Sequence, residues 1–229
     1  MKRIRDSIKG LLPRNIVEAI DREHQKETHI NRVLSRKKAP RIYLEIGVRD
    51  GACIRRIHAE ERIAVDPNPL FEEDKDIWGG VDLYKTTSDE FFATTGCKLV
   101  DVALVDGLHE FRQALRDVLN LEKLMSPDGV IFIHDCNPIT RRHQDDKNFT
   151  WNGDVWKVAD YLQRFRPELK FVTLDCDWGL GIVSGFDKNP PAPRTRDIEH
   201  VAGLDYSVLE KDRRKILNLR HPMLGRFIA

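Results

Sequence analysis

Acidic and histidine side chains recur in two short segments near the middle of the chain, Asp106-Gly-Leu-His109 and His134-Asp135. Each segment directly follows a run of apolar residues. A neutral imidazole can take a proton from a hydroxyl near pH 7, and carboxylates with bound water are the ligands that Mg²⁺ prefers. These residue types therefore indicate acid–base chemistry, with or without a metal ion.

A second group of polar residues and glycines follows two earlier apolar runs. Glu45, Gly47 and Gly51 surround the end of the first run, and Asp66 ends the next. Glycine lets the backbone turn sharply and approach a ligand, and an acid at the end of the second strand can accept hydrogen bonds from both ribose hydroxyls of a nucleoside. The spacing is not GxGxxG, because Arg49 takes the middle position, so it is weak as a dinucleotide fingerprint. A plain strand-to-helix turn, with Asp66 as a turn cap, stays open.

Short apolar runs alternate with helical patterns along the middle of the chain, which predicts βαβ units and a parallel sheet covered on both faces. The expected strands are 41–46, 62–66, 81–84, 99–106 and 130–135. The expected helices are 51–60, 88–92, 110–125 and 154–165. Two more strands, 170–175 and 179–184, are joined by a short turn that permits only antiparallel pairing. We expect an α/β fold, a Rossmann-like doubly wound sheet that is mostly parallel with an antiparallel C-terminal strand.

Both ends of the chain differ from this central pattern. Residues 1–39 are highly charged and predict an N-terminal helical extension, and 40–186 form the main domain. Residues 187–229 combine a proline-rich linker with a helical tail, whose helix we expect at 205–219. These flanking parts either mediate contacts between copies, as in a homo-oligomer, or close over the site.

Composition excludes several classes of protein. The 229 residues are 41 % hydrophobic and 33 % charged, which excludes disorder for the bulk of the chain. A net charge of +1, from 38 basic and 37 acidic residues, argues against a nucleic-acid binder. No apolar run approaches the roughly 18 residues of a membrane span, and no apolar signal region follows the N-terminus. Four scattered cysteines indicate reduced thiols, so we expect a cytoplasmic protein.

Taken in order, the motifs resemble those of class I S-adenosylmethionine-dependent methyltransferases, over about residues 40–185. They are closest to a branch with DGxH after the fourth strand and HD after the fifth, which includes sugar and small-molecule O-methyltransferases. The segments that carry the resemblance are Tyr43-Leu-Glu-Ile-Gly-Val-Arg-Asp-Gly51, Ala64-Val-Asp-Pro67, Thr87-Ser-Asp-Glu-Phe-Phe92, Val105-Asp-Gly-Leu-His109 and Leu124-Met-Ser-Pro-Asp-Gly-Val-Ile-Phe-Ile-His-Asp135.

The resemblance implies S-adenosyl-L-methionine as cofactor and a role for each matching position. The expected cofactor-binding residues are Glu45, Gly47 and Gly51 around the methionine part, Asp66 at the ribose, Ser88 with Asp89 near the adenine, and Asp106. The expected catalytic residues are Asp106, His109 and His134. Related sugar and catechol enzymes hold a metal after the fourth and fifth strands, which implies Mg²⁺ at Asp106 and Asp135, with Asn137 as a third ligand. The chain departs from the acid pair of the sugar enzymes at His134. Two histidines leave open both a transition metal and a metal-free mechanism with His109 or His134 as the general base.

The segment after the fifth strand is where class I enzymes bind the methyl acceptor. Aromatic faces stack on sugar rings, and Arg or Lys can hold an anionic group. We expect a small-molecule or glycan acceptor held by Arg141, Arg142, His143, Trp151, Asp154 and Lys157. For Asp154 the alternative is the N-cap of the next helix, and for Trp156 a place in the core.

Three other functions compete with sugar or small-molecule O-methylation. A nitrogen or protein acceptor is less favoured, because the chain lacks the Asn/Asp-Pro-Pro-Tyr motif of many amino-directed enzymes. A nucleotide-binding or oxidoreductase Rossmann protein is opposed by the poor GxGxxG and the antiparallel final hairpin. A non-catalytic partner subunit is opposed by the acids and histidines that the chain retains.

Overall fold

One mixed sheet organises the chain. The computed structural model describes residues 25–70, 78–95, 99–187 and 189–223. The strands are β1 (Ile42–Ile46), β2 (Glu61–Val65), β3 (Asp82–Tyr84), β4 (Val100–Val105), β5 (Met125–Ile133), β6 (Lys170–Leu174), β7 (Leu180–Ser184) and β8 (Leu219–Arg220). Their order across the sheet is β3-β2-β1-β4-β5-β7-β6-β8.

The pairing of the strands confirms the predicted fold class. Strands β3, β2, β1, β4 and β5 pair in parallel with their neighbours. Strand β7 runs antiparallel to both β5 and β6, as the short turn at 175–179 requires. The sequence did not predict β8, which adds two residues in parallel to β6 at the sheet edge.

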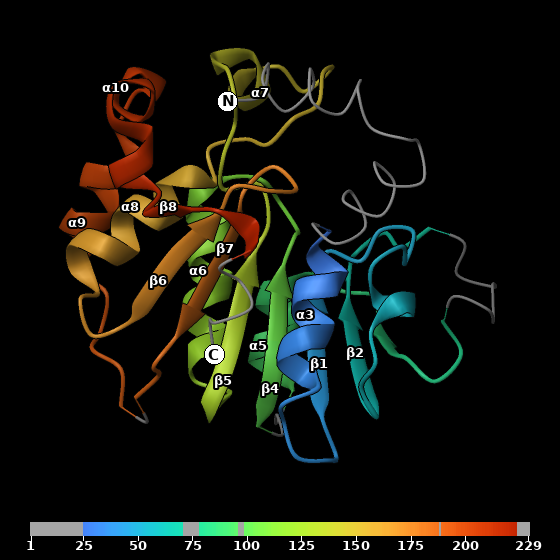
Figure 1. Cartoon of the computed structure of the whole chain (residues 1–229). Helices are drawn as coiled ribbons and strands as arrows, with labels where there is room; N and C mark the ends of the chain where they lie inside the picture. The colour runs from blue at the N-terminus through green and yellow to red at the C-terminus, as the bar shows by residue number, and fades with distance from the viewer. Residues whose placement is uncertain (1–24, 71–77, 96–98, 188, 224–229) are drawn as a thin grey trace.

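Alternate residues of the central strands enter two separate cores, one on each face of the sheet. Leu44 and Ile46 of β1 belong to one core and Tyr43 to the other. The helices are α3 (Lys26–Leu34), the 3-10 turn η1 (Ile54–Arg56), α5 (Ser88–Thr94), α6 (Phe111–Glu122), α7 (Arg141–Asp145), α8 (Trp156–Phe165), α9 (Thr195–Ala202) and α10 (Tyr206–Ile216). The first core includes side chains of α5, α6, α8, α9 and α10, and the second is covered by α3 and η1 (Figure 1).

Two of the expected helical boundaries are wrong. The helix expected at 51–60 is only the single turn η1, because the Asn31 side chain bonds to the backbone of Arg56 and His58 and holds that segment against α3. Helix α9 begins at Thr195, inside the segment expected to be linker. Of the expected N-terminal helical extension, residues 1–24 lie outside the described residues.

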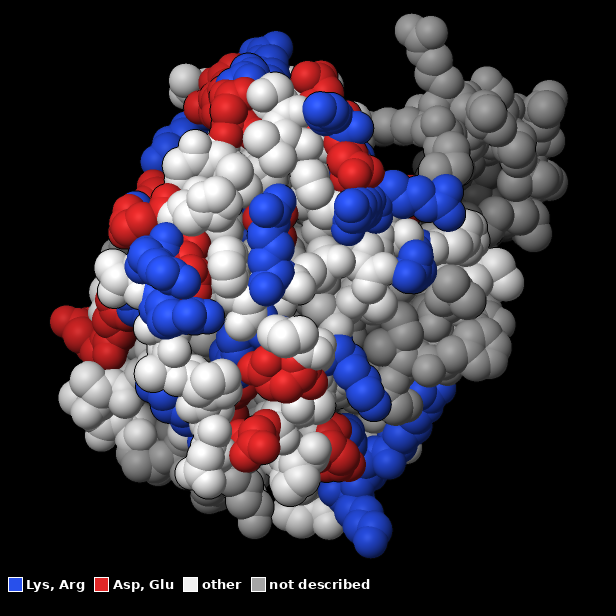
Figure 2. Space-filling view, turned by 90° about the vertical axis from the view of Figure 1, so that its left-hand side faces the viewer, with Lys and Arg blue, Asp and Glu red and all other residues white. Residues whose placement is uncertain are grey.

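Charges of both signs mix on the surface around α9 and α10. Figure 2 shows basic and acidic side chains side by side on this face, where Arg112 pairs with Glu199 and Arg141 with Asp205. None of the helices that the structure describes is long and apolar enough to cross a membrane. The described cysteines Cys53, Cys136 and Cys176 are buried, and Cys97 lies outside the described residues.

A buried ion pair ties α6 to the end of α8, and it yields a stability prediction. Both terminal nitrogens of Arg166 donate to Glu122, at 2.6 and 2.9 Å, with both side chains at most 3 % exposed. Removing one partner leaves a buried charge, so we expect Glu122→Ala to lower the free energy of unfolding by about 3 kcal/mol, measured by urea denaturation. This expected loss is small for a broken buried ion pair, because Glu168 still contacts Arg166 in the variant.

The exposed pair between Arg112 and Glu199 is the matched control. Water already solvates both of its side chains, so we expect Glu199→Ala to leave the unfolding midpoint unchanged. An equal loss of unfolding free energy in Glu122→Ala and Glu199→Ala would contradict the claim that the buried pair matters more than the exposed one.

Candidate active site

A cavity of about 1060 Å³ opens at the carboxyl ends of the parallel strands. Open α/β sheets bind ligands at this edge, where β1 and β4 lie side by side and their following connections leave to opposite faces. The loop after β1, the ends of β2, β4 and β5, the start of α5 and the segment 147–151 line it. Most residues expected to bind the cofactor or to react therefore face one space.

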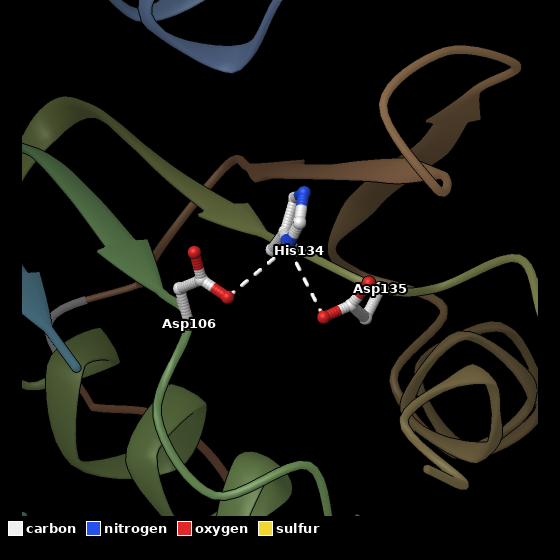
Figure 3. Close-up of side chains that lie close together, drawn as sticks. All are labelled: Asp106, His134 and Asp135. Carbon is white, nitrogen blue, oxygen red and sulfur yellow. Dashed lines mark hydrogen bonds and ion pairs between the residues drawn. The ribbon is translucent and has the colours of Figure 1, made fainter. Parts of the chain in front are cut away.

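Asp106, His134 and Asp135 meet at the floor of this cavity. Asp106 follows β4, and the two others follow β5, the neighbouring strand. The Nδ1 atom of His134 lies 3.1 Å from Asp106 Oδ1 and 3.1 Å from Asp135 Oδ2 (Figure 3). The sequence predicted this convergence, because adjacent parallel strands end at the same edge.

His109 joins the same carboxylates from the loop after β4. Its Nδ1 atom lies 2.9 Å from the carbonyl oxygen of Trp151, while Nε2 lies 3.2 Å from Asp135 Oδ2 and 3.5 Å from Asp106 Oδ1. Both ring nitrogens face acceptors, so the arrangement favours the doubly protonated ring. Burial opposes that charge, but the carboxylates outweigh it and raise the pKa of His109 above its ordinary value.

Lys26 and Asp177 complete the cluster, and sequence reasoning missed both. The ammonium of Lys26, in the first turn of α3, lies 2.9 Å from Asp106 Oδ2. The backbone N–H of Lys26 donates to Asp177 Oδ2 at 3.0 Å, and Asp177 Oδ1 lies 3.5 Å from His134 Nε2. Neither residue belongs to a motif, and the signal that could have found them is weak: a lone lysine in a charged helix and an acid in a tight turn.

The charges of this cluster stabilise one another. Burial disfavours the charged form of Asp106, but His134 and Lys26 hold the pKa of its carboxyl well below the ordinary value. Burial likewise opposes the charge on His134, yet Asp106 and Asp135 raise its pKa well above that of a free histidine. For Asp177, burial is outweighed by His134 and Lys26, and its pKa is lowered.

Strained backbone surrounds the same residues. Asp135, Asp177 and Trp178 adopt left-handed conformations, with φ of 60°, 44° and 61°, which residues other than glycine rarely adopt. Such conformations cost free energy and persist where the surrounding structure enforces them, most often at functional sites. Asp135 is held in place by Asn152, whose side-chain amide donates to its Oδ1 atom.

The loop after β1 passes very close to the end of β4. A Cβ atom at Gly47 would lie 2.3 Å from the backbone oxygen of Asp106, so no side chain fits there. Arg49, where the GxGxxG pattern has glycine, takes a φ of 45°, and its N–H donates to Asp66 Oδ2 at 2.8 Å. Asp66 therefore caps this loop and also lines the cavity. Glu45 is buried beneath it, and burial raises the pKa of its carboxyl to about 8.

A polar recess lies at the end of the cavity where the sequence places the adenine. Gln113 of α6 donates to Ser88 at 3.1 Å and to Asp117 at 3.0 Å, and all three side chains line the cavity. Burial raises the pKa of Asp117 to about 6. The sequence did not predict a role for Gln113 or Asp117, because polar positions of an amphipathic helix ordinarily face solvent.

Of the residues expected to bind the acceptor, only Trp151 lines the cavity. The others bond elsewhere: Arg141 with Asp205, Arg142 with Asp146, His143 with Thr140, Lys157 with Asp154 and the carbonyl oxygen of Ala202. The carboxylate of Asp154 also accepts from the N–H of Phe111, so it caps α6 rather than the helix that follows it. Trp156 is fully buried in the core. Phe149 and Trp178 line the cavity instead.

Asp106 and Asp135 are the expected ligands of Mg²⁺. Asp106, His134 and Asp135 each offer a ligand atom, all within 4.8 Å of one another. A histidine must be neutral to bind a metal, however, and both nitrogens of His134 face carboxylates. Lys26 already contacts Asp106, and the Asn137 side chain bonds to Asp175 and Arg213 instead. The residues present do not fit a divalent ion, and no step is assigned to one.

Comparison with known proteins places the fold. A methyltransferase of Podospora anserina, PaMTH1, solved with S-adenosylhomocysteine, is 17 % identical; the match covers 81 % of this chain and 96 % of that one, with a TM-score of 0.56. The O-methyltransferase TomG of Streptomyces achromogenes, solved with S-adenosylmethionine, is 14 % identical over 69 % of this chain and 79 % of that one, with a TM-score of 0.52. A search of curated proteins gives no significant sequence match.

A family model described as a methyltransferase domain matches residues 44–136. Residues 44–136 are similar to a methyltransferase domain, and the sheet and its helices have the Rossmann-like fold of the solved methyltransferases. The matched residues run from β1 to just beyond β5 and include Glu45, Asp66, Asp106 and His134. They therefore contain every strand end from which the methyltransferase domain builds the cavity, whereas Lys26 and Asp177 lie outside them.

Asp117 yields a prediction about stability and pH. Its folded pKa of about 6 exceeds the ordinary value of 3.8, so the folded protein retains the proton that the unfolded chain releases as pH rises from 3.8 to 6. Stability falls over that interval and the penalty persists above it. We expect Asp117→Asn to raise the free energy of unfolding at pH 7.5 by on the order of 2 kcal/mol, and by little at pH 4, in urea denaturation.

Asp89, which is exposed and pairs with Arg116, is the control for that measurement. Asp89→Asn should give no gain at pH 7.5. A gain of equal size at both pH values for Asp117→Asn would show that burial of its charge is not the cause.

Proposed function

We propose that this protein transfers the methyl group of S-adenosylmethionine to a hydroxyl of a sugar, a glycan or another small polar molecule. The observation that carries the proposal is His109, whose Nε2 atom faces two buried carboxylates at the floor of the cavity. A neutral hydroxyl is a weak nucleophile and must lose its proton as it is methylated, whereas a neutral amine attacks directly and releases its proton afterwards. Acid–base groups at this position therefore favour oxygen over nitrogen as the acceptor.

The cavity offers a different set of residues to each part of the cofactor. Gly47 leaves the backbone bare where the methionine part lies, and the carboxylate of Asp66, oriented by the N–H groups of Arg49 and Asn68, accepts from the ribose hydroxyls. Ser88, with Gln113 and Asp117, lines the adenine end. When bound, S-adenosylmethionine supplies an electrophilic methyl group on a positively charged sulfur.

His109 accepts the proton of the acceptor hydroxyl at Nε2. The ring must first release its own proton from that atom, and a positive charge entering the cavity favours this release by repulsion. Asp106 and Asp135 then stabilise the imidazolium that forms when the hydroxyl proton arrives. The bond to Trp151 fixes the ring orientation through Nδ1, so that Nε2 is the nitrogen that exchanges protons.

The rim of the cavity supports a sugar-like acceptor. Trp151 and Trp178 line the cavity, and the ammonium of Lys147 lies 4.5 Å from the centre of the Trp151 ring. A flat aromatic face beside polar and charged groups matches a ring that carries both C–H faces and hydroxyls. Phe149, which is 42 % exposed, extends the apolar part of the rim.

Asp66→Ala tests the position of the cofactor. Loss of charge-assisted hydrogen bonds to the ribose should weaken S-adenosylhomocysteine by about 1–3 kcal/mol, roughly 5- to 150-fold in Kd, by isothermal titration. Asp82→Ala, an exposed acid at the start of β3 and thus at the opposite edge of the sheet, is the control. Unchanged affinity in Asp66→Ala would contradict the assignment.

The base should be visible in the pH dependence of turnover. A base acts when deprotonated, and the pKa of His109 is raised, so kcat/KM should rise with pH and reach half its maximum above pH 6.5. His109→Asn should remove the rise and lower kcat about 100-fold or more, with S-adenosylhomocysteine still bound. His58→Asn, an exposed histidine, is the control. A profile that is unchanged in His109→Asn would exclude this residue as the base.

A further inference from the structure

Lys26 comes from the N-terminal helix, far in sequence from the strand ends, yet its ammonium reaches the floor of the cavity. It lies 2.9 Å from Asp106 Oδ2, and its side chain is 18 % exposed. A lysine on a loose extension would not hold a defined place beside a buried carboxylate. Its significance therefore depends on how firmly α3 is attached.

Several independent contacts fix the first turn of α3. The Lys26 N–H bonds to Asp177 at 3.0 Å, and Glu27 pairs with Arg56. Further along, the Asn31 side chain bonds to the segment after η1, and Ile30, with 0 % exposure, is buried in the second core. The helix and its lysine are therefore part of the domain's packed structure.

Both carboxylate oxygens of Asp106 and of Asp135 lie beside donor groups of the chain itself. Asp106 Oδ2 receives Lys26, and Asp106 Oδ1 faces both histidines. Asp135 Oδ2 faces both histidines and its Oδ1 receives Asn152. Asp177 receives the N–H of Lys26 on one oxygen and lies near His134 with the other.

The positive groups of the cluster are stabilised by the carboxylates that they contact. Three carboxylates surround one ammonium and two histidine rings, of which His109 has acceptors at both nitrogens and His134 has carboxylates at Nδ1. Burial alone would discharge Lys26, but Asp106 and Asp177 reverse that effect and raise its pKa above the ordinary value. A divalent cation at Asp106 Oδ2 would have to displace the ammonium of Lys26, which lies 2.9 Å from that oxygen.

We propose that Lys26 is the built-in cation of this active site, which occupies the face of Asp106 that a divalent metal would need and makes methyl transfer independent of metal ions. This inference rests on the proposed function for the reaction, and on the cluster geometry for the absence of a metal site. Lys26 neutralises Asp106 and orients it so that its other oxygen supports His134 and His109. It is a positioning residue, acting through Asp106 on the base.

The first test needs neither an acceptor nor a variant. Mn²⁺ is titrated into the wild-type protein bound to S-adenosylhomocysteine, and binding is followed by electron paramagnetic resonance and by the melting temperature. We expect no stoichiometric Mn²⁺ site and no metal-dependent rise in melting temperature. One Mn²⁺ bound per chain, and lost in Asp106→Asn, would overturn the proposal while leaving the proposed methylation intact.

The second test uses turnover with a hydroxylated acceptor. EDTA should leave wild-type activity unchanged, and Lys26→Ala should lower kcat about 100-fold with S-adenosylhomocysteine affinity within about threefold of wild type. Lys26→Arg, which keeps the charge, should recover at least a tenth of the lost rate. Activity abolished by EDTA and restored by Mg²⁺, or a Lys26→Ala variant that loses cofactor affinity but keeps kcat, would contradict the proposal.

Lys37 provides the matched control. It follows the same helix, its side chain is 7 % exposed, and it pairs with Asp128 at 3.0 Å, away from the cavity. Lys37→Ala removes a comparable lysine ion pair, so a general weakening of α3 would lower kcat in both variants. A loss of kcat confined to Lys26→Ala assigns the effect to the ammonium at Asp106. An equal loss of kcat in both variants would reject that assignment.

Discussion

The site depends on one constraint: three carboxylates are crowded at one end of a sheet, where little water reaches them. Asp106, Asp135 and Asp177 come from two strand ends and a tight turn that the sheet topology brings together. Uncompensated charges at such depth would be expensive, so each carboxylate must be matched by a positive group. The protonation of both histidines and the position of Lys26 follow from this requirement.

The fold satisfies that requirement with elements from distant parts of the chain. Parallel pairing of β4 and β5 sets Asp106 beside His134, and the antiparallel β7 brings the 175–179 turn to the same edge. Helix α3 packs across the sheet face and delivers Lys26 to that edge. The backbone at Asp135 and Asp177 is left-handed, and such strained conformations persist where the surrounding contacts enforce them.

Sequence reasoning found the parts of the site that obey the topology and missed those that depend on tertiary contacts. Asp106 and His134 were predictable, because apolar runs mark buried parallel strands and such strands end at a common edge. Lys26 was not, since one lysine among many in a charged helix carries no periodic signal. Arg141 and Lys157 were placed near the acceptor by chain position, but irregular segments do not fix side-chain direction, and both residues bond elsewhere. The branch within the methyltransferases, the acceptor, a homo-oligomer and a cytoplasmic location stay predictions.

A charge-balanced cluster also links cofactor binding to the state of the base. Lys26 and two histidine rings, whose pKa values the carboxylates raise, offset the three carboxylates, and the nitrogen of His109 that must accept a proton faces two of them. Lys26 cannot release its charge, because Asp106 and Asp177 stabilise it. Any positive charge that enters the cavity must therefore be offset by proton loss from a histidine, and His109 is the more exposed of the two, at 23 % against 10 %. A permanent ammonium at Asp106 thus makes His109, rather than the lysine, the group that responds when a cationic ligand binds.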